Sequence, residues 1–173
     1  MFATIYLPDF YLQAALRHQP ELRAKPVALI DDLEKKAVII QLNATAAQTG
    51  VRGGMTPSQG LARCLHLVVK TRTSSGEKRL QEILLHFASS LAPYVEATAA
   101  GLCTVQFTDA KNLLPKVTRV IEQLGDTEIV AQAGIAPTPD ASFLAAHQAK
   151  PVLQVDDATA FLAALPIEVL TMH

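Results

Sequence analysis

The order of the strands and helices expected outside residues 20–73 restricts this chain to few folds. Residues 2–7 are β-branched, aromatic or aliphatic apart from Ala3 and predict a strand, which Pro8 ends. Apolar periodicity after residue 73 predicts a helix at 74–91, strands at 94–97 and 102–107, a helix at 109–125, a strand at 129–135, a helix at 140–147, an edge strand at 152–155 and a last helix before Pro166. Strand, helix, strand, strand, helix, strand is the order of a ferredoxin-like βαββαβ sheet, so we predict an α+β fold.

Residues 20–73 have the pattern of a small α/β module inserted after the first strand. A two-proline connector at 20–26 leads to predicted strands at 27–30 and 38–42, joined by a polar turn at 31–36. Short helices are expected at 44–48 and 57–63, followed by a strand at 67–69. We therefore predict two domains, a discontinuous one of residues 1–19 and 74–173 and an inserted one of residues 20–73.

Polar residues before the apolar runs predict where the helices begin. The expected capping residues are Asp9, Asn43, Thr56 with Gln59, Ser74 with Glu77, Asp109, Asp140, and Asp156 or Asp157. Gly50 and Gly101 are placed to supply the left-handed residue of a helix end and of a strand turn.

The charge of the chain is unevenly divided. The formal net charge is −1, yet residues 1–80 hold eleven Lys and Arg against six Asp and Glu, and residues 81–173 hold four against ten. Residues 1–80 could therefore bind a polyanion, whereas residues 81–173 disfavour one. The alternative is that these charges are an ordinary solvated surface with no polyanionic partner. The candidates for contacts to a DNA backbone are Arg52, Lys70, Arg72 and Lys78. We expect weak, salt-sensitive DNA binding without base readout.

The composition excludes several classes of protein. No run approaches the roughly 20 apolar residues that span a bilayer, and the N-terminus lacks a signal-peptide pattern. Cys64 and Cys103 stand alone, which favours free thiols in a reducing cytoplasm. Residues 50–54 do not have the spacing of a phosphate-binding loop.

A phosphoryl-transfer site on such a sheet needs carboxylates that converge on Mg²⁺. The first strand ends in Leu7, and the central hairpin offers Gly101 and Leu102, none of which binds a cation. The nearest acids are Asp9, Glu96 and Asp109. Asp9 and Asp109 are explained as helix caps and Glu96 as a solvated strand residue, so we expect no catalytic residue, no bound metal and no cofactor. The alternative is an active enzyme that uses these three acids as shifted Mg²⁺ ligands.

Four segments, in order and with matching spacing, resemble Y-family (UmuC/DinB-type) DNA polymerases. Residues 20–28, PELRAKPVA, resemble the family's "PELRGKPVAV", and residues 43–56 resemble "SYEARKFGVRSGM". Residues 59–69 resemble "EALRLCPDLVV", and residues 134–136 resemble the "GIS" or "GIA" after a palm strand. The resemblance runs from residue 2 to about 155. It implies a palm-like domain of residues 1–19 and 74–173 and a fingers-like insertion of residues 20–73.

The departures from the family pattern fall on functional positions. The first metal-binding Asp of "VDMD" falls on Leu7, and the Asp-Glu pair of "SLDEAYLDVT" falls on Gly101 and Leu102. The Tyr and Arg of "YEAR", which contact the triphosphate, fall on Ala44 and Ala47, and no Lys follows at 137–139. This pattern resembles the ImuB-like branch of the family.

The resemblance to that branch implies a protein that is not an enzyme. It would act as an accessory scaffold in translesion synthesis, SOS-type DNA repair and damage-induced mutagenesis, in the bacterial cytoplasm near the nucleoid. The implied partners are a sliding clamp, an error-prone replicative-type polymerase and a RecA-like protein. The chain ends where the family's thumb would begin, so thumb, little finger and clamp-binding tail are expected to be absent. A ferredoxin-like regulatory domain that binds a small molecule is the remaining alternative.

Overall fold

A computed structural model describes residues 1–31 and 37–166, so most of the predicted turn at 31–36 and the last seven residues lie outside the described part. The chain divides into two compact units, one of residues 1–8 and 81–173 and one of residues 9–80. Each unit has a sheet and is considered by itself.

The unit of residues 1–8 and 81–173 is built on a five-stranded sheet in the order β5-β6-β1-β7-β8. The strands are β1 (Phe2–Tyr6), β5 (Tyr94–Ala99), β6 (Leu102–Gln106), β7 (Gln132–Ala136) and β8 (Val152–Gln154). The strand β1 lies between β6 and β7 and is antiparallel to both, whereas β8 runs parallel to β7 at the edge. This is the ferredoxin-like arrangement with one added edge strand, which confirms the predicted fold class.

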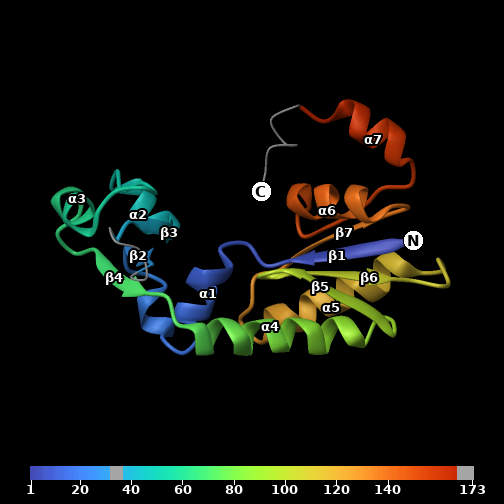
Figure 1. Cartoon of the computed structure of the whole chain (residues 1–173), viewed down its shortest axis with the longest axis horizontal. Helices are drawn as coiled ribbons and strands as arrows, with labels where there is room; N and C mark the ends of the chain where they lie inside the picture. Colours follow the sequence, from blue (N-terminus) through green and yellow to red (C-terminus); the bar gives the residue numbers. More distant parts are fainter. Residues whose placement is uncertain (32–36, 167–173) are drawn as a thin grey trace. The chain divides into compact units, whose positions relative to one another are not determined.

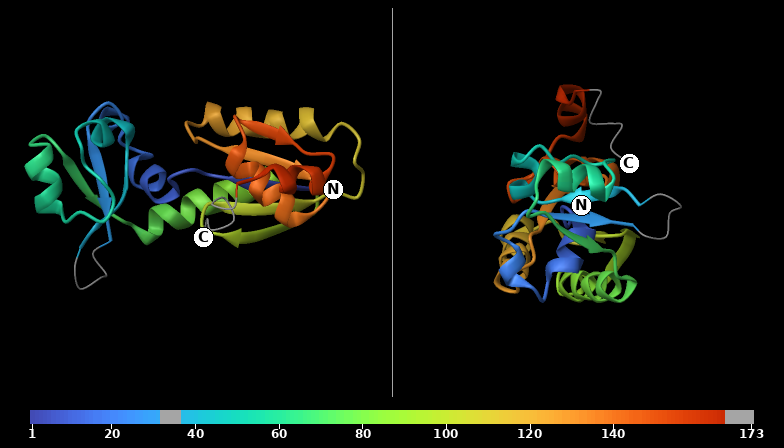
Figure 2. Two further views of the ribbon diagram at one scale, coloured as in Figure 1. Left: turned by 90° about the horizontal axis from the view of Figure 1, so that it is seen from above. Right: turned by 90° about the vertical axis from the view of Figure 1, so that its left-hand side faces the viewer.

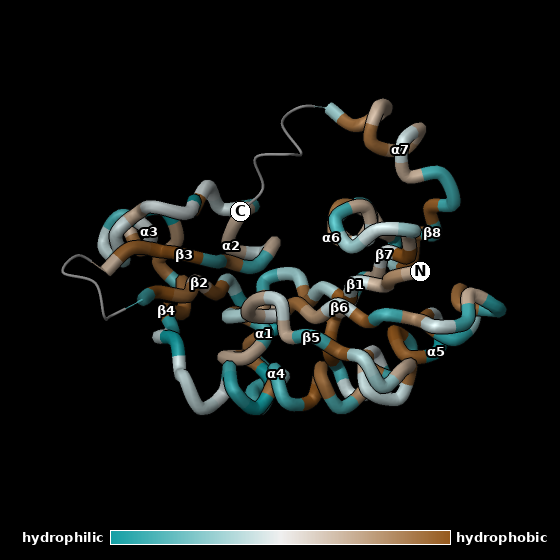
Figure 3. The backbone as a smooth tube through the Cα atoms, turned by 45° about the vertical axis from the view of Figure 1, so that its right-hand side comes forward, coloured by the Kyte–Doolittle hydropathy of each residue, from teal (hydrophilic) through white to brown (hydrophobic). Residues whose placement is uncertain are grey.

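Helices cover both faces of this sheet. Figure 1 shows α6 (Pro139–Gln148) on one face and α5 (Leu113–Asp126) with the later part of α4 (Ser74–Ser89) on the other, and α7 (Ala158–Ala164) follows β8. Because β1 has helices on both sides, Ala3, Ile5 and Leu7 are fully buried on one face, and Thr4 is fully buried on the other. Polar and apolar residues alternate along α4, as expected for a helix with one buried face (Figure 3).

The unit of residues 9–80 holds a three-stranded sheet in the order β3-β2-β4 (Figure 2). Its elements are α1 (Phe10–Leu16), the 3₁₀ turn η1 (Pro20–Leu22), β2 (Val27–Ile30), β3 (Ile39–Leu42), α2 (Ala44–Gln48), α3 (Pro57–Arg63) and β4 (Val68–Thr71). The strand β2 is antiparallel to β3 and parallel to β4. The strands and helices predicted for residues 20–73 are confirmed to within two residues.

Successive residues of β2 build cores on opposite faces of this sheet. Val27 and Leu29 pack with Leu12 and Leu16 of α1, whereas Ala28 packs on the other face with the cluster Ile39, Ala46, Val51 and Leu67. Burying each of the large side chains stabilises the fold by about 1.5–3 kcal/mol. The Leu12 N–H also donates to the Gln41 side chain at 2.8 Å. These contacts place α1 with the insertion, so the unit begins at residue 9, not at the predicted residue 20.

The predicted caps divide into those that the structure forms and those that it does not. The side chains of Asn43 and Asp157 accept from the helical N–H of Ala46 and Ala160, and Thr56 forms the predicted capping box. Four predicted caps are wrong, namely Asp9, Ser74, Asp109 and Asp140. Asp9 precedes α1 with a left-handed backbone and makes no capping bond, and Ser74 is itself the first helical residue of α4.

At α5 and α6 the helix begins at another residue than predicted. The left-handed Asn112 precedes α5, and Asp109 instead accepts from the Lys111 N–H at 3.0 Å within the preceding loop. Thr138 caps α6, which leaves Asp140 in the first turn of the helix. An acid in that turn still interacts favourably with the helix dipole.

Within the described part of the chain, no helix combines the length and the apolar character needed to cross a membrane.

Candidate functional site

The end of β1 and the turn between β5 and β6 meet at one end of the sheet. The Leu7 N–H donates to the Gly101 carbonyl at 2.8 Å, and Tyr6 is paired with Leu102. Gly101 has a φ of 72°, which a glycine adopts without strain. The structure therefore brings together Leu7, Gly101 and Leu102, the three positions that the sequence resemblance assigned to a metal site.

Gln81 of α4 holds this turn in place through both polar atoms of its side chain. Its Oε1 accepts from the Gly101 N–H at 2.8 Å, and its Nε2 donates to the Leu102 carbonyl at 3.4 Å. Sequence reasoning missed Gln81, because nothing local distinguishes it from any other polar residue on an amphipathic helix.

The residues at this end of the sheet do not fit a divalent cation. Leu7 is fully buried and Leu102 is 9 % exposed, so apolar, buried side chains stand where Mg²⁺ would need oxygen ligands. Among the described residues of either unit, no three His, Cys, Asp or Glu side chains are grouped so that they could hold a metal. Of the three acids in the alternative hypothesis, Glu96 and Asp109 belong to one unit and Asp9 to the other.

Those three acids have separate surroundings. Glu96 is exposed on β5, and Asp109 is exposed in the loop before α5. Asp9 is exposed, but the partial burial of its carboxyl raises its pKa above the ordinary value. Desolvation of this kind requires no metal.

The positions assigned to triphosphate contacts lie on a largely apolar surface of the other unit. Ala44 and Ala47 of α2 line an open hollow of about 460 Å³ with Leu42, Gln48, Val51, Arg52 and Gly53. The Arg52 guanidinium donates to the carbonyls of Ala47 and Val51 at 2.7 and 2.8 Å. Arg52 thus provides a hydrogen-bond donor for a carbonyl at the C-terminal end of α2, and this contact reduces the freedom of its guanidinium to reach DNA.

The other candidate cations for DNA differ in how they are neutralised. Arg72 donates to both carboxylate oxygens of Glu77, at 2.9 and 2.8 Å, and to Asp31 at 2.8 Å. Its guanidinium lies 4.0 Å from the centre of the Tyr11 ring. The hydrogen bond to Glu77 is the main cause that raises the pKa of Arg72. Arg72 is therefore a structural tie, whereas Lys78 is exposed on α4 and Lys70 lines a pocket described below.

A match to a known family extends over most of the palm-like and fingers-like sequence. The model of the impB/mucB/samB family matches residues 5–147. The chain belongs to the impB/mucB/samB family. The unit with the five-stranded sheet has the palm fold of this family, and the unit with the three-stranded sheet has its fingers fold. The resemblance to Y-family polymerases predicted this fold.

Relatives in this family are named as DNA polymerases. The chain is 25 % identical over 170 residues to DNA polymerase IV of Legionella pneumophila (strain Paris), covering 93 % of this chain and 48 % of the relative. It is 27 % identical over 168 residues to DNA polymerase IV of Pectobacterium atrosepticum, covering 92 % and 48 %. The chain thus spans about half the length of these curated relatives.

Solved structures share the fold at low sequence identity. A post-insertion binary complex of Dbh DNA polymerase superposes with a TM-score of 0.86 at 16 % identity, covering 97 % of this chain and 52 % of that one. DinB from Sulfolobus solfataricus gives a TM-score of 0.82 at 16 % identity, with the same coverage. These likenesses establish the Y-family palm-and-fingers fold.

The family match corrects one expectation from the sequence. The prediction that the chain is not an enzyme is wrong against the comparisons, because the curated relatives are named as DNA polymerases. The prediction rested on a few substituted metal and triphosphate positions, whereas the family match takes in residues 5–147. The assignment to the ImuB-like branch stays a prediction.

Proposed function

We propose that this protein acts in DNA damage tolerance, as a Y-family polymerase-like participant in translesion synthesis. The family match and the palm-and-fingers fold support this role. The DNA polymerase IV relatives belong to the same class, and the chain shares with them about half of their length.

Within that process, the role that the described residues support best is binding. The observation that carries this proposal is the apolar end of β1, where Leu7 is buried and Gln81 holds the Gly101–Leu102 turn by two hydrogen bonds. Leu7, Gly101 and Leu102 are buried, so the exposed part of this fixed turn is formed by Ala99 and Ala100. We propose that the protein has an accessory role in synthesis past a lesion and binds a protein partner at this turn. The partner would be an error-prone polymerase, a RecA-like protein or a sliding clamp.

The relatives favour a second function, template-directed nucleotide incorporation by the whole protein. The names of the curated relatives are the observation in its favour. Its metal ligands would have to come from residues other than Leu7, Gly101 and Leu102.

A lesion-bypass assay separates the two functions. The whole protein is added to a primed template with an abasic site, alone with Mg²⁺ or Mn²⁺ and together with an error-prone replicative-type polymerase. The accessory role expects more bypass product from the second polymerase. Primer extension by the protein alone would assign it the second function, and no effect in either arm would contradict both.

A matched pair of variants tests the proposed surface. Gln81→Ala removes both hydrogen bonds to the turn and is expected to reduce the stimulation of bypass. Glu82→Ala changes the next residue of α4, which is exposed, and should leave stimulation unchanged. Equal stimulation by both variants would contradict a role for this turn.

A further inference from the structure

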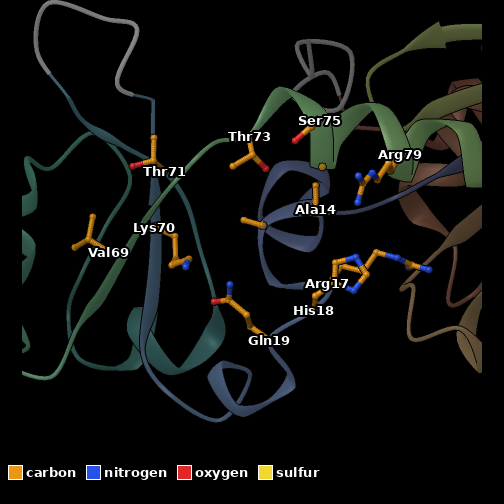
Figure 4. Close-up of a pocket in the computed structure, with 12 residues that line it drawn as sticks. Ala14, Arg17, His18, Gln19, Val69, Lys70, Thr71, Thr73, Ser75 and Arg79 are labelled. Atoms are coloured by element: carbon orange, nitrogen blue, oxygen red, sulfur yellow. The ribbon is translucent and has the colours of Figure 1, made fainter.

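The unit of residues 9–80 contains a pocket lined by basic residues and separate from the end of β1. It has a volume of about 540 Å³ and is referred to here as the basic pocket. Three segments line it, namely the end of α1 with the residues after it, β4, and the beginning of α4 (Figure 4). These segments are distant in sequence but belong to one compact unit.

The charge of the basic pocket is one-sided. Arg17, Lys70 and Arg79 line it together with His18, and no Asp or Glu is among the lining residues that the structure describes. Figure 4 shows Lys70 on the β4 side and Arg79 on the α4 side, with Arg17 and His18 following α1. Like charges that share one pocket repel each other, and an anion between them removes that cost.

The described carboxylates near the pocket do not pair with Lys70 or Arg79. Glu77 stands in the first turn of α4, but both of its oxygens accept from Arg72, and Asp31 accepts from the same guanidinium. Within residues 1–31 and 37–166, Lys70 and Arg79 form no ion pair. Arg72 thus holds Asp31 and Glu77, and neither Lys70 nor Arg79 is paired with a carboxylate of the described residues.

The remaining lining groups are hydrogen-bond donors. The hydroxyls of Thr73 and Ser75 have no hydrogen-bond partner in the described part of the chain, and both line the pocket. They stand at the start of α4, a helix of 16 residues whose first N–H groups lack helical acceptors. Gly76 allows the start of α4 to lie close to α1 and to the Thr73 hydroxyl. A Cβ at this position would be 2.7 Å from that hydroxyl and 3.3 Å from the Ala14 carbonyl of α1.

We propose that the basic pocket binds the phosphate groups of a nucleotide, either free or within a single strand of nucleic acid. Cations on opposite walls match a ligand with more than one phosphate group, such as a diphosphate or successive phosphodiesters. The volume lies in the range of small-molecule pockets. The site is distinct from Ala44, Ala47 and the end of β1, so it goes beyond the proposed function.

Titration calorimetry on the whole chain tests the proposal with three probes: inorganic pyrophosphate, dATP, and a single-stranded oligonucleotide of about eight nucleotides. The variants are Lys70→Gln, Arg79→Gln and the double substitution, whose folding is checked by circular dichroism. Both side chains reach solvent, so their loss should not unfold the unit. Arg63→Gln is the matched control, since Arg63 is exposed at the end of α3 and does not line the pocket.

At least one probe is expected to bind the native chain. Each single substitution should weaken that binding about tenfold, because it removes one charge-assisted hydrogen bond, and Arg63→Gln should change it little. Tighter binding of pyrophosphate or dATP identifies a free ligand, and tighter binding of the oligonucleotide identifies a strand. The proposal is overturned if no probe binds, or if the double variant binds as well as the native chain. Neither result depends on bypass activity.

Discussion

Cys103 and Cys64 show how strongly position decides the chemistry of a residue. Cys103 is fully buried in β6, and burial raises the pKa of its thiol to about 12. Cys64 is partly exposed just after α3. The thiolate is the reactive form, so the buried cysteine is both shielded and protonated at neutral pH.

We therefore expect one fast thiol and one protected thiol in the native protein. At pH 8 a thiol-specific reagent should modify Cys64 quickly and Cys103 only as the protein unfolds. Because folding raises the pKa of Cys103, its burial also lowers the free energy of unfolding as the pH rises above the ordinary thiol value of 9.0. Cys64→Ser is the control, and it should abolish the fast phase. Two thiols that react at equal rates in the native protein would contradict this assignment.

Four hydroxyl groups form a ladder across the larger sheet. Thr98 and Thr104 are 3.0 Å apart, Thr104 and Thr4 3.3 Å, and Thr4 and Ser142 2.8 Å. The Ser142 hydroxyl also reaches the Pro139 carbonyl at 2.7 Å. A carbonyl only accepts, so Ser142 donates to it and receives the proton of Thr4. By the same reasoning Thr104 donates to Thr4, which gives this part of the ladder a fixed direction.

Removing the buried end of this ladder should destabilise the fold. Ser142→Ala leaves Thr4 without its closest partner and is expected to lower the free energy of unfolding by about 1–3 kcal/mol in urea titrations. The double variant Thr4→Val/Ser142→Ala should cost less than the sum of its single changes. Thr98→Val, at the exposed end, should cost little. Strict additivity would show that the Thr4–Ser142 contact contributes nothing.

At the scale of elements, two glycines of the same unit are expected to respond in opposite ways. Gly134 lies in β7 against α6, and a Cβ there would overlap backbone atoms of Ser142, Ala145 and Ala146. Gly125 lies in α5, where a Cβ would meet nothing within 4 Å. The first glycine sets the distance between strand and helix, and the second only lowers helix propensity.

Substitution by alanine should separate these roles. Gly134→Ala must push α6 away from the sheet and is expected to cost more than about 3 kcal/mol, at the upper end of single-residue effects. Gly125→Ala should stabilise the protein by about 0.5–1 kcal/mol. Both are measured by chemical denaturation. A tolerated Gly134→Ala would mean that β7 and α6 do not pack as described.

Sequence patterns predicted elements better than their first residues. Every strand of the ferredoxin-like core was expected. In the buried strands, burial imposes a short apolar pattern that can be recognised without knowledge of the neighbours, whereas β5 is mostly exposed. Asn43 and Thr56 were predicted as caps correctly, since each is followed at once by a short helix. Asp109 was not, because α5 begins only after Asn112. Where several polar residues precede an apolar run, packing of the helix chooses among them.

The candidate sites could be predicted only in part, because they depend on contacts between residues that are distant in the sequence. The meeting of Leu7 with the Gly101–Leu102 turn followed from the order of the strands. Gln81 and the basic pocket could not be predicted, because each depends on groups that separate segments bring together, two segments for Gln81 and three for the pocket. Nor could the sequence show that Arg72 is held by Asp31 and Glu77 while Lys70 is not.

At the scale of the molecule, the division of charge coincides with the division into units. Residues 9–80 hold all eleven Lys and Arg of the first part, against six acids, whereas the other unit holds four against ten. A polyanion therefore has one favourable unit to bind.

We expect DNA binding by the whole chain to depend on salt rather than on sequence. Affinity should fall as a power of salt concentration, with a slope of roughly −0.7 for each phosphate of single-stranded DNA that is contacted. Fluorescence anisotropy with oligonucleotides of unrelated sequence should give the same affinity for each. Binding that is unchanged between low and high salt, or that prefers one sequence, would contradict a purely electrostatic interaction.

The same separation of charge has a practical consequence for handling the protein. A net charge of −1 would lead one to expect weak retention on any ion-exchange resin near neutral pH. A resin, however, responds to the surface that faces it rather than to the sum. With formal charges of +5 on one unit and −6 on the other, the protein should be retained at low salt by both cation and anion exchangers.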